Sequence, residues 1–187
     1  MPAVPRLIAS ESVLVVVDVQ DKLLAAMPTA DALVRSVGFL LDVANLLDIP
    51  ARNAEHYPKG LGPTHPDIAR RLPPDPPAKT AFSCCGAAGF QDSLDKLGRR
   101  TAVVVGMESH VCAAFTALDL LAAGYSVFVP VDAVASRFSL DAETALRRLD
   151  RAGAILTTAE SVAFEWMHDA THPNFKAVSK LVRDRAR

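Results

Sequence analysis

Three side chains that together could carry out nucleophilic chemistry are spread along the chain: Asp18, Lys79 and Cys112. A thiolate is a strong nucleophile, a carboxylate can accept the thiol proton, and an ammonium group can stabilise both anions by charge. The Cys112 thiolate could then attack a carbonyl carbon. Taken singly, Asp18 also fits a turn or helix cap and Lys79 a solvated surface group. Their chemistry depends on a fold that brings them together.

The residues around Cys112 predict a strand, a turn and a helix. Residues 101–105, TAVVV, are typical of a buried strand, Gly106 of a turn, and the following residues to Leu121 of an amphipathic helix with Cys112 in its first turn. Free backbone N–H groups point outward at such a junction. We expect the helix dipole and nearby cations to lower the pKa of the Cys112 thiol. We expect amides between Glu108 and Cys112 to bind an oxyanion, where one donor is worth ~3 kcal/mol.

The rest of the chain alternates predicted strands with predicted helices. No two strands are joined by a tight hairpin, which favours an α/β fold with a parallel sheet and helices on both faces, built as one domain over residues 1–187. Asp18 ends the first strand, and Lys79 lies near the start of a short third strand. The predicted strands are 12–18, 49–54, 78–83, 101–105, 125–131 and 154–157. The main helices are 31–47, 86–97, 140–151, 161–168 and 174–183, together with the helix that carries Cys112 in its first turn.

A segment rich in proline and glycine, residues 55–77, follows the second strand. We expect it to be a long loop that forms part of a site. His56 and His65 invite a metal site together with Glu55 and Asp67, but their spacing matches no compact ligand motif. We therefore expect surface or substrate-facing histidines and no metal. The adjacent Cys84 and Cys85 are expected to be small, partly buried residues.

Composition excludes several classes of protein. The chain has 187 residues, of which 50% are hydrophobic and 22% charged, and its formal net charge of −1 provides no field for nucleic acid or anionic lipid. No apolar run reaches the ~18 residues of a membrane span, and no signal core is apparent, so we expect a cytoplasmic protein. Three cysteines make no disulfide framework. The turn DVQDK after the first strand lacks the GxGxxG of dinucleotide-binding enzymes.

Three blocks of sequence resemble those of a known superfamily. LVVVDVQ with Asp18, AKTAFS with Lys79, and GMESHVCAAFTALDLLAAGYSVFVPVDAVASR with Cys112 look like the signature blocks of the isochorismatase-like hydrolases, also called the cysteine hydrolase superfamily. The resemblance extends over residues 13–180. Within the superfamily, AEHYPKGLGPT and HPNFKAVSKLV are most similar to the branch of isochorismatase domain-containing proteins.

This resemblance implies both a fold and a reaction. It implies a three-layer sandwich around a six-stranded parallel sheet of order 3-2-1-4-5-6. It also implies that Asp18, Lys79 and Cys112 form a triad that hydrolyses the C–N bond of a small amide or carbamoyl compound through a covalent acyl-enzyme, without a cofactor. A non-proline cis peptide bond is implied between Met107 and Glu108. True isochorismatases cleave a vinyl ether without a cysteine, so Cys112 argues against that reaction.

Two departures from the superfamily's patterns bear on the substrate. The stretch ARNAEHYPKG breaks the Asp-x-His element of metal-binding nicotinamidases, which argues against that activity. Glu108 stands where several members have a small residue. We expect a substrate pocket lined by Tyr57, Phe82 and Glu108, with Gln20 nearby.

The alternative function is a catalytically weak binding or assembly module on the same fold. Apolar residues of the two tail helices suit either a second subunit, giving a homo-oligomer, or simple coverage of the sheet. These residues are Phe164, Trp166, Met167 and Phe175. We expect the partners of the chain to be a small-molecule substrate and further copies of itself.

Overall fold

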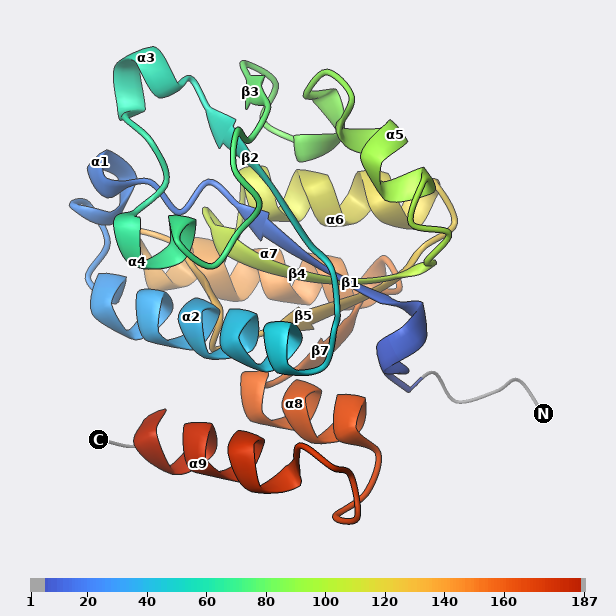
Figure 1. Ribbon diagram of the computed structural model, residues 1–187. Coiled ribbons are helices and arrows are strands. Elements are labelled where there is room, and N and C mark those ends of the chain that lie inside the picture. Colours follow the sequence, from blue (N-terminus) through green and yellow to red (C-terminus); the bar gives the residue numbers. More distant parts are fainter. Residues whose placement is uncertain (1–5, 186–187) are drawn as a thin grey trace.

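A parallel β-sheet lies between two layers of helices in the computed structural model, which describes residues 6–185 (Figure 1). The strand order is β3-β2-β1-β4-β5-β7, and a short β6 pairs with the end of β4. Every paired strand runs parallel to its neighbours. The strands are β1 Ser12–Val17, β2 Ala51–His56, β3 Ala78–Lys79, β4 Thr101–Met107, β5 Ser126–Pro130, β6 Val134–Ala135 and β7 Ile155–Thr157.

The helices fall into two groups, one on each face of the sheet. α2, α8 and α9 pack on one face, and α5, α6 and α7 pack on the other (Figure 1). The α-helices are α1 Asp21–Leu24, α2 Ala30–Leu46, α3 Pro58–Leu61, α4 Pro66–Ala69, α5 Phe90–Asp95, α6 Cys112–Ala122, α7 Ser139–Arg151, α8 Ala159–Met167 and α9 Phe175–Arg185, with 3-10 turns at Ala9–Glu11 and Cys84–Gly86.

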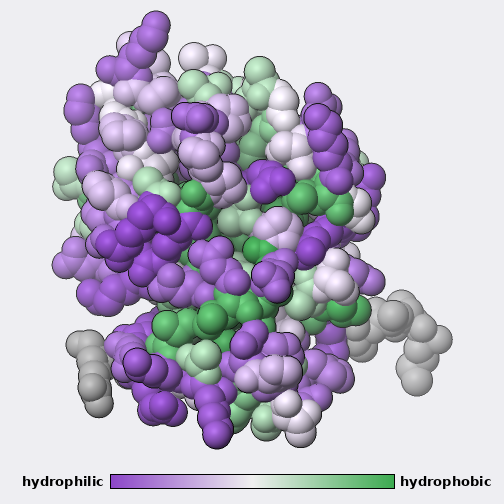
Figure 2. Space-filling view, viewed as in Figure 1, coloured by the Kyte–Doolittle hydropathy of each residue, from purple (hydrophilic) through white to green (hydrophobic). Residues whose placement is uncertain are grey.

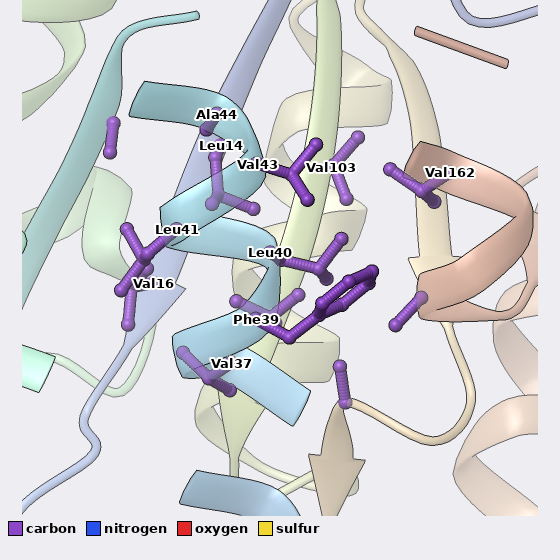
Figure 3. Packing of buried hydrophobic residues seen from close by; sticks show 14 of the residues in the cluster. Leu14, Val16, Val37, Phe39, Leu40, Leu41, Val43, Ala44, Val103 and Val162 are labelled. Carbon is purple, nitrogen blue, oxygen red and sulfur yellow. The ribbon is translucent and has the colours of Figure 1, made fainter. Parts of the chain in front are cut away.

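The central strands are buried on both faces because their side chains alternate between two apolar clusters. Leu14 and Val16 of β1 pack under α2, whereas Val13 and Val15 pack under α6 on the opposite face. Figure 3 shows the first cluster, with α2 lying over β1 and β4. The continuous run of aliphatic residues in SVLVVV is therefore what a strand covered on both sides requires.

Gly106 allows β1 and β4 to stay paired up to their carboxyl ends. Its φ is 113°, and a Cβ atom at this position would lie 2.1 Å from the carbonyl oxygen of Val17. Only glycine fits such an approach of two backbones. As a result, the residues that follow β1 and β4 emerge side by side at the same edge of the sheet.

The expected sheet order is confirmed, with one additional strand. β7 takes the position predicted for the sixth strand, and β6 is a two-residue strand that the sequence pattern did not predict. The third strand was predicted to extend to Ser83 but ends at Lys79. The expectation of one long loop over residues 55–77 is wrong in part, because α3 and α4 each begin there with a proline at the first turn.

The tail helices α8 and α9 pack against α2 and against each other on one side of the sheet. Trp166 and Met167 of α8 are only 3% and 2% exposed and belong to the cluster under α2, whereas Phe164 is 40% exposed. Hydrophilic residues cover most of the face in Figure 2, and a band of hydrophobic ones crosses it at the level of α2 and α9. Within residues 6–185, no helix is long and apolar enough to cross a membrane.

Candidate active site

Asp18 and Lys79 form a buried ion pair at the carboxyl edge of the sheet. Lys79 Nζ donates to Asp18 Oδ2 at 2.7 Å, and both side chains are fully inaccessible to solvent. Burial raises the pKa of the Asp18 carboxyl, and the Lys79 ammonium opposes that rise. The other carboxylate oxygen, Oδ1, is buried and has no hydrogen-bond partner among the described residues. One face of the carboxylate thus remains available to accept a proton.

The parallel strands bring these two residues together. Asp18 follows β1 directly, with a φ of 47°, a left-handed conformation that Asp tolerates better than most residues. Lys79 ends β3, opposite His56 at the end of the neighbouring β2. Lys79 Nζ also donates to the carbonyl oxygen of Phe82 at 2.8 Å, which fixes the turn after β3. Both bonds hold the ammonium group beneath the surface.

Cys112 is the first residue of α6 and is only 7% exposed. The expectation of a lowered thiol pKa is wrong. Burial, and next the negative charge of the nearby Asp18 carboxylate, raise the pKa of the Cys112 thiol to about 12, although the Lys79 ammonium acts in the opposite direction. With this pKa the thiol is protonated at neutral pH, so any nucleophilic reaction of Cys112 requires a base that removes its proton.

In the turn between β4 and α6, the N–H groups of Ser109, Val111 and Ala113 all donate to carbonyl oxygens of the protein. The Met107–Glu108 peptide bond is cis. The carbonyl oxygen of Glu108 accepts from the N–H groups of Val111 and Ala113 at 3.0 and 3.1 Å. Over residues 6–185, the Cys112 N–H makes no hydrogen bond. That group is available to a ligand at the start of the helix.

Glu108 is paired with Arg137, a residue that no sequence pattern singles out. Arg137 Nε donates to Glu108 Oε1 at 2.9 Å, and the two side chains are 50% and 13% exposed. The residues meet because β6 pairs with the end of β4, with Met107 opposite Ala135. Since the sequence pattern did not predict β6, nothing pointed to this contact.

Tyr57 and Phe82 are exposed aromatic residues on the loops that follow β2 and β3. Their exposed fractions are 54% and 51%. The Phe82 ring lies 5.6 Å from the ring of His56 and 6.2 Å from that of Phe115, measured between centroids. The carbonyl oxygen of Phe82 binds Lys79. An apolar wall therefore stands beside the buried ion pair.

Gln20 is fully buried, and its amide is bonded to backbone on both sides. Its Nε2 donates to the carbonyl oxygens of His56 and Gly62, and its Oε1 accepts from the N–H of His56. These bonds fix the start and the end of the loop that carries Tyr57. The structure therefore places Gln20 behind the loop as its support.

Three of the four residues considered for a metal make other contacts, whereas His56 Nδ1 is buried and has no hydrogen-bond partner among the described residues. Glu55 Oε1 accepts from the backbone and the hydroxyl of Thr64, and His65 Nδ1 accepts from the Asp67 N–H. Among the residues that the structure describes, no group of three or more His, Cys, Asp or Glu side chains is arranged to hold a metal ion.

The Thr116 side chain links Cys112 to the segment that contains Cys84 through two hydrogen bonds. Its hydroxyl donates to the carbonyl oxygen of Cys112 at 2.7 Å and accepts from the N–H of Cys84 at 2.9 Å. Cys84 is completely buried, and burial raises the pKa of its thiol strongly. Cys84 therefore lies behind the nucleophile candidate as an inert neighbour, whereas Cys85 is partly exposed.

Comparisons with known proteins agree with this fold. An isochorismatase domain model matches residues 12–161. Isochorismatase domain-containing protein 2 of Bos taurus is 40% identical over 185 residues, which cover 98% of this chain and 88% of that protein.

Two solved structures are similar over almost the whole chain. A structure titled MAR1 ribonuclease, from Caenorhabditis elegans, has a TM-score of 0.89 at 38% identity and covers 96% of this chain and 93% of its own. The YcaC gene product of Escherichia coli, described as an octameric hydrolase of unknown specificity, has a TM-score of 0.91 at 25% identity and covers 100% and 95%. Given the domain match and the similarity to full-length relatives, the chain belongs to the isochorismatase family.

Proposed function

We propose that this protein is a cysteine-dependent hydrolase that cleaves the C–N bond of a small amide or carbamoyl compound. The single observation that carries the proposal is the buried ion pair of Lys79 and Asp18. Both of its charges act on the pKa of the Cys112 thiol. Asp18 Oδ1 has no hydrogen-bond partner among the described residues. Membership of a family of isochorismatase-like hydrolases supports a hydrolytic reaction.

In the proposed first step, Asp18 acts as the base. Oδ1 takes the thiol proton while Sγ of Cys112 bonds to the carbonyl carbon, whose oxygen becomes the oxyanion. The free N–H of Cys112 donates to that oxyanion. Protonated Asp18 then gives its proton to the leaving nitrogen as the C–N bond breaks, which leaves a thioester on Cys112 and releases ammonia or an amine.

The second step regenerates the enzyme. Asp18 removes a proton from water, the resulting hydroxide attacks the thioester carbon, and the thiol leaves with its proton restored while the acid product departs. The ammonium group of Lys79 opposes the rise in the pKa of Asp18 that burial causes, and so favours the carboxylate form that acts as the base. Tyr57, Phe82 and Glu108 form the walls around the substrate, and Gln20 supports the Tyr57 loop from behind.

The test of this proposal uses two substitutions and a panel of small amides and carbamoyl compounds. We expect Cys112→Ala to abolish hydrolysis, and Asp18→Asn to lower kcat by about 10³-fold, the usual weight of a general base. Asn suits the left-handed backbone at position 18. Cys85→Ala serves as the control that removes an off-site thiol. Hydrolysis that survives both substitutions would refute the mechanism.

The relative titled a ribonuclease makes RNA a necessary member of the panel. A net charge of −1 gives this chain little attraction for a phosphate backbone. We therefore expect no RNA cleavage that depends on Cys112. The octameric hydrolase of Escherichia coli supports the further proposal that copies of this chain assemble, which size measurement in solution tests.

A further inference from the structure

A second ion pair lies on the rim beside the proposed nucleophile. Glu108 follows β4 and Arg137 follows β6, so both residues emerge at the carboxyl edge of the sheet together with Asp18 and Cys112. The Glu108 charge contributes to the raised pKa of the Cys112 thiol, so it acts directly on the reacting sulfur. Arg137 compensates that charge.

The guanidinium group of Arg137 is only partly used. Its Nε is bonded to Glu108, and within residues 6–185 no other hydrogen bond or ion pair engages it. The two terminal amino groups of a guanidinium can bind both oxygens of a carboxylate. Because the Glu108 side chain is 13% exposed and that of Arg137 is 50% exposed, the arginine faces solvent and the glutamate holds it from below.

A cavity of about 1000 Å³ opens beside this arginine. Its walls are mainly apolar and belong to the loop before α2 and the start of α7. Of the charged residues that line it, Arg137 is the cation, and Asp141 and Glu143 of α7 are the anions. The cavity leaves room for a small molecule beside the guanidinium group.

We propose that Arg137 is a specificity-determining residue that selects amides carrying a carboxylate, with Glu108 as its positioning residue. This inference rests on the proposed function, since it names the substrate class of the same site. A cationic substrate would have to displace Arg137 from Glu108, whereas an anionic one uses the unoccupied edge of the guanidinium. The substrate is then a short monoamide of a dicarboxylic acid.

The first experiment measures binding by protection of Cys112 from iodoacetamide, and so does not depend on turnover. Malonamate, succinamate and glutaramate are compared with propanamide, butyramide and pentanamide, and with the cationic 3-aminopropanamide. We expect at least one anionic amide to protect Cys112 at about one tenth of the concentration that its neutral partner needs, the size of effect typical of a charge-assisted contact.

The second experiment assigns this preference to Arg137. Arg137→Gln should remove the preference for the anionic amide, and Arg137→Lys should keep part of it, because lysine retains charge but not the planar fork. Arg151→Gln, at the far end of α7, removes the same charge and should keep the wild-type preference. Equal protection by anionic and neutral amides, best protection by the cationic amide, or a preference that survives in Arg137→Gln would overturn the inference.

Hydrolysis of the same compounds separates this inference from the proposed function. Anion-selective protection without any hydrolysis would support the role of Arg137 and refute the hydrolase. Hydrolysis through Cys112 without anion selectivity would do the reverse. If both hold, Arg137→Gln should raise KM for the anionic amide about tenfold with a smaller change in kcat, as expected for a group that binds the part of the substrate that does not react.

Discussion

The Lys79–Asp18 and Arg137–Glu108 ion pairs lie at the same edge of the sheet, one sealed from solvent and the other open to it. The inner pair has side-chain exposures of 0% and 0% with an N–O distance of 2.7 Å, and the rim pair has 50% and 13% with 2.9 Å. Nearly equal distances therefore accompany very different environments. Burial strengthens the interaction and makes the loss of either partner costly, whereas solvent screens the outer pair.

This difference suits the two proposed roles. A base that must accept a proton from a thiol benefits from a low dielectric and a fixed geometry, which the inner pair has. A residue that recognises a diffusing anion must remain partly hydrated and accessible, which Arg137 is. Cys112 is affected by both pairs, because Asp18 and Glu108 each raise the pKa of its thiol.

The largest effect should come from breaking each pair in turn. Lys79→Met leaves a buried carboxylate without its counterion and should lower the free energy of unfolding by about 3–5 kcal/mol. Arg137→Met should cost no more than about 1 kcal/mol. Urea denaturation measures both. Adding Asp18→Asn to Lys79→Met should recover most of the lost free energy of unfolding. If Lys79→Met and Arg137→Met lowered the free energy of unfolding by similar amounts, the contrast between the buried pair and the rim pair would be contradicted.

A smaller effect should follow from loosening the loop behind the inner pair. Thr116→Val removes the acceptor of the buried Cys84 N–H and should lower the free energy of unfolding by about 1–3 kcal/mol. Thr116→Ser keeps the hydroxyl and is the matched control. Because the Thr116 hydroxyl also donates to the carbonyl oxygen of Cys112, kcat should fall in Thr116→Val and recover in Thr116→Ser. An unchanged urea midpoint would show that this hydrogen bond contributes nothing.

The rate at which the Cys112 thiol is alkylated tests whether Asp18 raises or lowers the pKa of that thiol. Asp18 raises the pKa of Cys112, so Asp18→Asn should lower that pKa and increase the thiolate fraction at pH 8 to 9. Alkylation of Cys112 by iodoacetamide should then become several-fold faster while amide hydrolysis is lost, since one pKa unit is a factor of ten in thiolate. Slower alkylation in Asp18→Asn would mean that Asp18 activates the resting thiol.

Acid pH should affect hydrolysis through Asp18. The proposed base is the carboxylate, and burial raises its pKa above the ordinary value of 3.8. Hydrolysis should therefore decline as pH falls through this raised pKa, at a higher pH than an ordinary aspartate would give. A pH profile of kcat/KM checks this, and a profile that stays flat down to pH values near 4 would exclude Asp18 as the base.

The smallest effect should be that of salt on the rim pair. Raising NaCl from about 0.05 to about 0.5 M shortens the screening length to a few ångströms, so the protection of Cys112 by an anionic amide should weaken by a few-fold. The stability difference between wild type and Lys79→Met should stay constant over the same range, because the inner pair is out of contact with solvent. Protection that does not change with salt, together with a stability difference that does, would contradict the assignment of the buried pair and the rim pair to these two roles.

The fold was predictable from the sequence because its signals are local and strong. Aliphatic runs such as SVLVVV mark buried strands, and β-α alternation marks a parallel sheet. The short elements were not predictable in the same way. β6 has two residues, too few for any pattern. Prolines are typical of loops but are also favoured in a first helical turn, so Pro58 and Pro66 do not by themselves distinguish a loop from the starts of α3 and α4.

The site was predictable only in outline. Parallel strands send their carboxyl ends to one edge, and the structure does place Lys79 against Asp18 there. The direction of the Cys112 pKa could not be predicted, because it depends on burial and on the approach of Asp18. The partner of Glu108 was equally hidden, since Arg137 reaches it only through the unpredicted pairing of β6 with β4.

The most direct test of the central claim is the mass of the enzyme during turnover. Wild-type protein is mixed with an amide that it hydrolyses, quenched in acid within milliseconds to seconds, and mapped by peptide mass spectrometry. The mechanism predicts the acyl mass of the substrate on the peptide containing Cys112, and its absence from Cys112→Ala. Hydrolysis that proceeds at the wild-type rate in Cys112→Ala, with no acyl adduct on Cys112 in either protein, would contradict it.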